Sequence, residues 1–134
     1  MLQYNMNKHG FQTSAEYGDL QVSNQGEHGY RPYEMMVSSI AGCSGLALKK
    51  ILEKMRITFS DIQVTANIVR NPNVANRIEK MYLTFTVIAT DATDKKLEKA
   101  LELTHKNCGM IQSVKDSIMI TESIVKAGFN NYSN

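Results

Sequence analysis

The sequence predicts an α+β fold, because segments with strand periodicity and segments with helix periodicity do not alternate regularly along it. Residues 61–90 hold two runs of period-two alternation around the turn-forming NPNVAN, which predicts an antiparallel hairpin. Residues 32–57 are a long apolar run, and residues 93–116 repeat apolar positions at helical spacing. These observations argue against a doubly wound parallel sheet, in which strands and helices come in strict turn.

Residues 1–30 are polar and carry four glycines that favour turns. Between these glycines, FQTSA and DLQVS alternate weakly between apolar and polar residues. We therefore expect short strands linked by hairpins in this part of the chain.

The apolar run of residues 32–57 predicts one long helix. Pro32 suits the first turn, where its missing N–H has no intrahelical partner to lose, and Glu34 complements the helix dipole there. No charged residue lies between Met35 and Leu48, so we expect this half to be buried nearly all round. Charged residues return from position 49 onward, which predicts a second half that reaches solvent.

The later segments complete a single domain of residues 1–134. Thr93 or Asp94 is expected to cap a helix, and MIQSVKD to form a short second one. Residues 117–126 are expected to form the last strand, followed by a tail, NNYSN, that we expect to fray.

Composition and charge limit the classes of function. A net charge of +2, with basic residues mixed among acidic ones, gives no stripe for nucleic acid. We find no run of roughly 18 apolar residues and no signal-peptide core, so no membrane contact is expected. The chain is therefore expected in the cytoplasm, where its two cysteines would be reduced at rest.

Cys43 is the first candidate site residue. It lies beside Gly42, Ser44 and Gly45, and each glycine inside a helix costs about 1 kcal/mol relative to alanine. Close packing against another element is one reason for such small residues, and the usual burial of cysteine favours it. Access is the other reason, because a sulfur without bulky neighbours can meet a substrate.

Cys108 is the second candidate. It precedes GMIQSV, so we expect it at a helix N-terminus, where free N–H groups and the dipole lower a thiol's pKa. A small cap residue in a tight joint is the alternative. His105 either tunes this thiol or faces solvent beside Lys106, whereas His9 and His28 lie in polar segments and are expected to be solvated. No C-x-x-C or H-x-x-x-H spacing supports a zinc site, so no metal is expected.

Three segments, in their order and separation, resemble the OsmC/Ohr family, the osmotically inducible and organic-hydroperoxide-resistance proteins. They are RPYEMMVSSIAGCSG, IEKMYLTFTV and THKNCGMIQSV, and the resemblance covers essentially the whole chain. The Pro32-x-Glu34 start before Cys43 is most similar to the small, poorly characterised OsmC-like branch.

The resemblance implies an intertwined homodimer, with antiparallel β-sheets wrapped around central helices and active sites at the interface. It also implies a thiol peroxidase for oxidative-stress defence, without metal or haem. Cys43 would attack an organic hydroperoxide as a thiolate and become a sulfenic acid, which condenses with Cys108 to a disulfide. An external dithiol would reduce that disulfide, so no cofactor is expected.

The chain departs from the peroxidase pattern around both cysteines. Peroxidase members have an activating Arg in the N-terminal strand region and a Glu ten residues before the first cysteine. This chain has no Arg before Arg31, and Tyr33 takes the Glu position. Arg31 and Glu34 are therefore the candidates for the polar groups near the thiol. GMIQSV also replaces the Pro and His that tend to follow the second cysteine.

Two alternatives to catalysis stay open. The missing Arg favours a non-catalytic dimer that senses redox state or binds an apolar small molecule. Met35, Met36 and Met55 would give such a dimer a pliable apolar pocket. The other alternative is a purely structural domain with inert thiols.

Overall fold

The computed structural model describes residues 1–128 and confirms the α+β class. Within these residues two three-stranded sheets and three helices form two compact units, Met1–Ser38 and the chain from Ser39 onward. The expected fraying of NNYSN lies outside the described residues. The grouping of the whole chain into one domain stays a prediction.

The first unit contains the short strands expected among the early glycines. Strands β1 (Asn5–Met6), β2 (Phe11–Ser14) and β3 (Asp19–Val22) pair antiparallel in that order. Gly10 is required before β2, because a Cβ there would lie 1.9 Å from the Val22 carbonyl oxygen. His9 and His28 are both exposed, as expected, and their rings stack with centroids 3.6 Å apart.

Helix α1 (Pro32–Lys54) begins at the expected proline. Its buried residues form one stripe with a spacing of four, namely Ile40, Ser44, Leu48 and Leu52. We expected the uncharged half of α1 to be buried on nearly all sides, and this was wrong for the single chain. Only this stripe of the helix is buried there. Leu46, on another face of the uncharged half, is 72% exposed.

The length and composition of α1 also correct the expectation that no run could cross a membrane. The helix has 23 residues and contains an 18-residue window with a mean hydropathy of 1.3. Of the residues in this window, 22% are buried. A core helix of a soluble protein meets the same criterion. The cytoplasmic location therefore stays a prediction.

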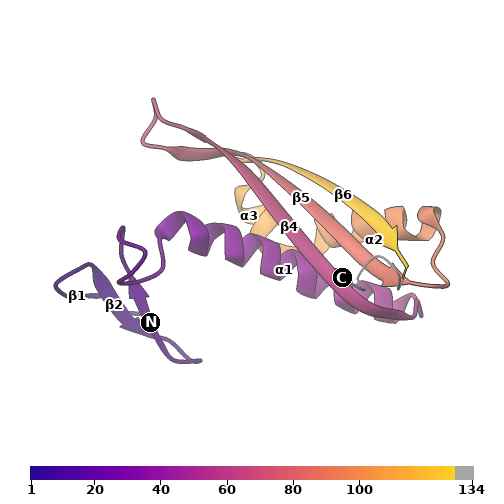
Figure 1. The fold of residues 1–134 in the computed structure, drawn as a ribbon, viewed down its shortest axis with the longest axis horizontal. Helices are drawn as coiled ribbons and strands as arrows, with labels where there is room; N and C mark the ends of the chain where they lie inside the picture. The colour runs from indigo at the N-terminus through magenta and orange to yellow at the C-terminus, as the bar shows by residue number, and fades with distance from the viewer. Residues whose placement is uncertain (129–134) are drawn as a thin grey trace. The chain divides into compact units, whose positions relative to one another are not determined.

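The second unit holds a sheet of long strands in the order β4-β5-β6 (Figure 1). Strands β4 (Phe59–Asn71) and β5 (Arg77–Ala89) form the expected antiparallel hairpin. Strand β6 (Met119–Ala127) pairs parallel with β5, so antiparallel pairing does not extend to this strand. The reason is the crossover through α2 (Asp94–Asn107) and α3 (Gly109–Val114), since parallel neighbours need such a connection.

Two predicted apolar faces supply much of the core of the second unit. On α2, Thr93 is the N-cap, and its side chain accepts a hydrogen bond from the Lys96 N–H at 3.2 Å. The predicted inward stripe of this helix is buried, and so is the alternating face of β5. These residues are Leu97, Ala100, Leu101 and Thr104 on α2, and Met81, Leu83, Phe85 and Val87 on β5.

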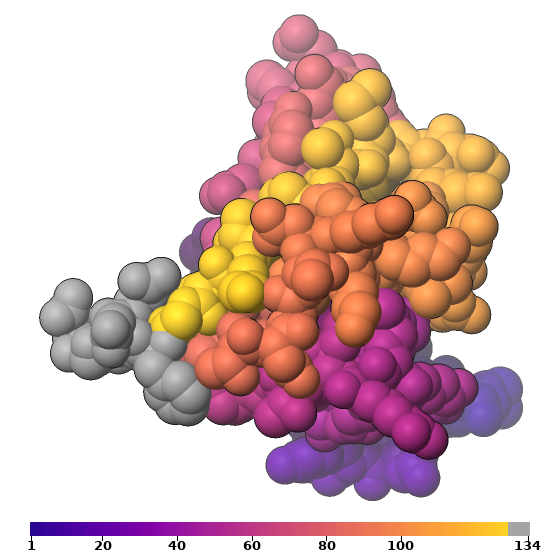
Figure 2. All heavy atoms as spheres, turned by 90° about the vertical axis from the view of Figure 1, so that its right-hand side faces the viewer, coloured from indigo at the N-terminus to yellow at the C-terminus, as the bar shows by residue number. Residues whose placement is uncertain are grey.

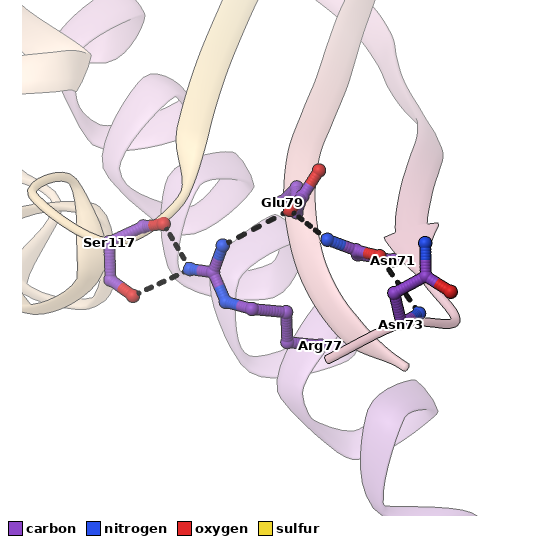
Figure 3. A network of polar contacts seen from close by, with 5 residues as sticks. All are labelled: Asn71, Asn73, Arg77, Glu79 and Ser117. Atoms are coloured by element: carbon purple, nitrogen blue, oxygen red, sulfur yellow. Dashed lines mark hydrogen bonds and ion pairs between the residues drawn. The ribbon is translucent and has the colours of Figure 1, made fainter. Parts of the chain in front are cut away.

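A polar network joins the turn of the β4–β5 hairpin to the residues before β6 (Figure 3). Arg77 Nη2 donates to the Ser117 carbonyl oxygen at 2.6 Å and to its hydroxyl at 3.0 Å. Arg77 Nη1 lies 3.6 Å from Glu79 Oε1, which accepts from Asn71 Nδ2 at 2.7 Å. Asn71 Oδ1 in turn accepts from the Asn73 N–H at 2.9 Å. Arg77 is therefore the link between the hairpin and the start of β6.

We expect Arg77→Ala to lower the free energy of unfolding by about 1 kcal/mol, because it removes charged donors from a partly exposed network. Lys80→Ala is the matched control, since Lys80 is an exposed basic residue on the same strand. Urea denaturation of both variants measures the difference. Equal stability of the two variants would contradict this role for Arg77.

Candidate functional site

The two cysteines, distant in sequence, meet in the second unit. Cys43 lies on α1 and is partly buried, whereas Cys108 is fully buried at the N-cap of α3. Both are free thiols, and their side chains are hydrogen-bonded to one another. The fold thus places two reduced sulfurs in contact, one of them accessible.

The start of α3 surrounds the Cys43 sulfur with backbone donors. The N–H of Met110 and, more weakly, that of Gly109 donate to it. The first N–H groups of a helix have no intrahelical partner, so they are free to bind a sulfur. The Met110 amide is the main reason that the pKa of Cys43 is lowered, and the Cys108 thiol and the Gly109 amide add to this. Burial opposes the shift but does not cancel it, so Cys43 is the thiol that ionises more readily.

Cys108 has the opposite tendency. Burial is the main reason that its pKa is raised, and its hydrogen bond to Cys43 adds to the effect. The amides of Ile111 and Met110 offset only part of this increase. The prediction that Cys108 begins the short helix is confirmed. The predicted net lowering of its pKa was wrong, because burial outweighs the amides at the helix start. The amides at that helix start favour Cys43 as the anion, and Cys108 keeps its proton.

The two glycines beside Cys43 have different surroundings. A Cβ at Gly45 would lie 3.4 Å from Val64 Cγ2, so this glycine faces strand β4 at packing distance. A Cβ at Gly42 would have no atom within 4 Å among the described residues. Packing therefore accounts for Gly45, whereas no contact among the described residues requires a glycine at position 42.

Arg31 and Glu34 lie in the first unit. The Arg31 side chain lies beside Gly26, where a Cβ would come within 3.2 Å of Nε. Glu34 lines a cavity of about 700 Å³ together with Tyr17 and Tyr30. The part of Arg31 and Glu34 in the cysteine chemistry stays a prediction.

His105 has a partner that the sequence did not identify. Its Nδ1 lies 2.5 Å from Glu122 Oε1 on β6, so neither expected environment, the Cys108 thiol or solvent, describes it fully. A signal for this partner was present, because Glu122 alternates with Ile120 and Ile124 on one face of the last strand. An acid on an apolar face calls for a polar partner from another element.

Comparison with known proteins gives matches along most of the chain. A profile of the OsmC-like protein family matches residues 24–123. Protein YhfA of Escherichia coli K12 is 27% identical over 105 residues, which is 78% of each chain. A hypothetical protein from Aquifex aeolicus VF5 has a TM-score of 0.85 at 22% identity, with 96% of each chain covered. An organic hydroperoxide resistance protein from Elizabethkingia anophelis has a TM-score of 0.71 at 17% identity, over 95% of this chain and 96% of that one. The two solved structures share this fold over nearly their whole length.

Proposed function

This chain belongs to the OsmC-like protein family, and on that premise we propose that it is a thiol peroxidase that reduces organic hydroperoxides. The observation that carries the proposal is the contact between Cys43, whose pKa is lowered chiefly by the Met110 amide, and Cys108, whose pKa is raised chiefly by burial. A nucleophile needs the first property, and a resolving thiol beside it can carry the second. The organic hydroperoxide resistance protein with the same fold supports the substrate class.

The proposed reaction begins at the Cys43 thiolate. Its sulfur attacks one peroxide oxygen, the O–O bond breaks, and the alkoxide leaves with a proton from solvent as an alcohol. Cys43 becomes a sulfenic acid, and the amides of Gly109 and Met110 hold the sulfur in place throughout. Cys108 then loses its proton and attacks the Cys43 sulfur, which releases water and forms the disulfide. The peroxide has gained two electrons from two thiols, and an external dithiol restores them by exchange.

Arg31 and Glu34 are the candidates to assist Cys43 from the first unit. A guanidinium near the sulfur would favour the thiolate, and a carboxylate would hold that guanidinium in place. Within the second unit, backbone amides and the Cys108 thiol already lower the pKa of Cys43. We therefore expect Arg31→Ala to reduce the rate of peroxide reduction without abolishing it.

We propose that the working form is a homodimer. The uncharged half of α1 leaves Leu46 72% exposed, and an apolar side chain so exposed on a charge-free stretch suits an interface. We expect sedimentation to give twice the 15.0 kDa chain mass for the wild type. Leu46→Lys should shift the protein toward monomer, because it places a charge on this face. Val74→Lys is the control, since Val74 is an exposed apolar residue in the β4–β5 turn. A wild-type monomer would contradict the dimer.

The opposite pKa shifts of the two cysteines predict the pH dependence of their reactivity. The pKa of Cys43 is lowered, so its thiolate is already present below about pH 8.5, where a free cysteine ionises. This thiolate is lost as the pH falls through the lowered pKa. The pKa of Cys108 is raised, so its thiolate appears only above that pH. We expect iodoacetamide to modify Cys43 first between pH 6 and about 8. Peptide mass spectrometry identifies the site, and faster labelling of Cys108 in this range would contradict the assignment.

Consumption of cumene hydroperoxide with excess dithiothreitol tests the function itself. The proposal predicts many turnovers per chain with this dithiol and fewer with a monothiol, which must reduce the disulfide in two separate encounters. One oxidation event without turnover would favour redox sensing over catalysis. Unreactive thiols in the folded protein would favour a purely structural domain.

A further inference from the structure

Helix α3 is too short to fix its own position. It has 6 residues, and isolated helices of fewer than about 12 residues are marginal in water. Ile111 is its buried residue, and the other residues of the helix are wholly or partly exposed. The amides of Gly109 and Met110, which donate to the Cys43 sulfur, therefore depend on contacts that other elements make with α3.

The side chain of Gln112 supplies one such contact with α2. Its Nε2 donates to the His105 carbonyl oxygen at 3.0 Å, across the joint that contains Cys108. Carbonyls in the last turn of a helix have no intrahelical donor, so this acceptor is available. The Gln112 N–H donates to the Cys108 carbonyl oxygen, also at 3.0 Å. Gln112 thus joins the end of α2 to the helix that carries the two amides.

His105 is itself anchored to the sheet. Its ring Nδ1 lies 2.5 Å from Oε1 of Glu122 on β6, and the Glu122 side chain is only 6% exposed. Figure 2 shows the face on which orange α2 lies against yellow β6. The carbonyl that Gln112 binds therefore belongs to a residue held by the sheet, which makes it a fixed point for α3.

We propose that Gln112 is a positioning residue for the Cys43 thiolate. Its bond to the His105 carbonyl fastens α3 to the end of α2. The amides of Gly109 and Met110 are thereby kept on the Cys43 sulfur. The inference rests on the proposed function for its part in peroxide reduction, because Cys43 is the nucleophile of that reaction.

Gln112→Met tests the inference without a change of charge. Methionine has nearly the length of glutamine but no N–H donor in its side chain, so it removes the bond to His105. Ser113→Ala is the matched control, since Ser113 is also exposed on α3 but its Oγ donates within the same helix, to the Gly109 carbonyl oxygen at 2.7 Å. The readout is the rate at which iodoacetamide labels Cys43 in the reduced, full-length protein. Peptide mass spectrometry measures this rate from about pH 5 to about pH 10.

We expect Gln112→Met to raise the midpoint of this pH profile. Below the wild-type midpoint, labelling of Cys43 should be about two- to tenfold slower, the factor that the net contribution of one hydrogen bond provides. The rate at the alkaline plateau should not fall, because the sulfur stays as accessible as before. Ser113→Ala should leave the whole profile unchanged. If circular dichroism shows that Gln112→Met does not fold, Gln112→Ala removes the same donor and is measured in its place.

An unchanged midpoint in the folded Gln112 variant would overturn the inference. An equal shift in Ser113→Ala would do the same, because the loss of any polar group on α3 would then suffice. A rate lowered by one factor at every pH would also overturn it, since that result indicates reduced access to the sulfur. Alkylation involves no peroxide, so these outcomes are decided separately from the hydroperoxide turnover that tests the proposed function.

Discussion

Cys43→Ser is expected to reduce consumption of cumene hydroperoxide at least ~10³-fold, because a serine hydroxyl has almost no anionic form at neutral pH. The amides of Gly109 and Met110 lower the pKa of the Cys43 thiol, but a serine hydroxyl is too weak an acid for them to ionise it near neutral pH. The measurement is peroxide loss under excess dithiothreitol at pH 7, with circular dichroism to confirm folding. Activity equal to that of the wild type would remove Cys43 from the mechanism.

Cys108→Ser is the matched control for that experiment, since it also removes one sulfur. The proposal predicts that this variant still reacts once with peroxide, because Cys43 keeps the amide donors that lower its pKa. Its product should be a Cys43 sulfenic acid that dimedone traps, with no internal disulfide. Loss of the first reaction in Cys108→Ser would show that Cys108 does more than resolve.

Phe85→Ala is expected to lower the free energy of unfolding by about 3–5 kcal/mol, because it leaves a large cavity in a packed core. Phe85 is fully buried on β5, the central strand of its sheet, between two other strands. Tyr82→Ala is the control, since Tyr82 is an aromatic residue on the same strand that is 41% exposed. We expect its effect to be about 1 kcal/mol or less. Urea denaturation distinguishes the two, and a Phe85→Ala loss no larger than that of Tyr82→Ala would contradict this account of the core.

The elements of the fold could be predicted because each depends on local pattern. The hairpin follows from period-two alternation around NPNVAN, and α2 begins at a threonine cap with an apolar stripe behind it. The parallel pairing of β6 could not be predicted from its own residues, because strand direction depends on where the crossover returns the chain. The exposure of Leu46 was also unpredictable, since an uncharged helix face does not reveal what covers it.

The two cysteines of the site could be predicted from the sequence, but which of them ionises could not. Cys43 and Cys108 were paired through family resemblance, since spacing alone could not bring them together. Which of them ionises depends on three-dimensional contacts, because amides at the start of α3 act on both thiols but outweigh burial only at Cys43. The partner of His105 was missed for the same reason. Glu122 lies on β6, which is separated from α2 in the sequence by helix α3.

The central claim is that Cys43 and Cys108 form one peroxide-reactive pair. Addition of one equivalent of cumene hydroperoxide to the reduced protein, followed by acid quenching and peptide mass spectrometry, tests it most directly. The account predicts rapid conversion to a Cys43–Cys108 disulfide within one chain, with one equivalent of alcohol released. Two cysteines that remain reduced while the peroxide persists would contradict it.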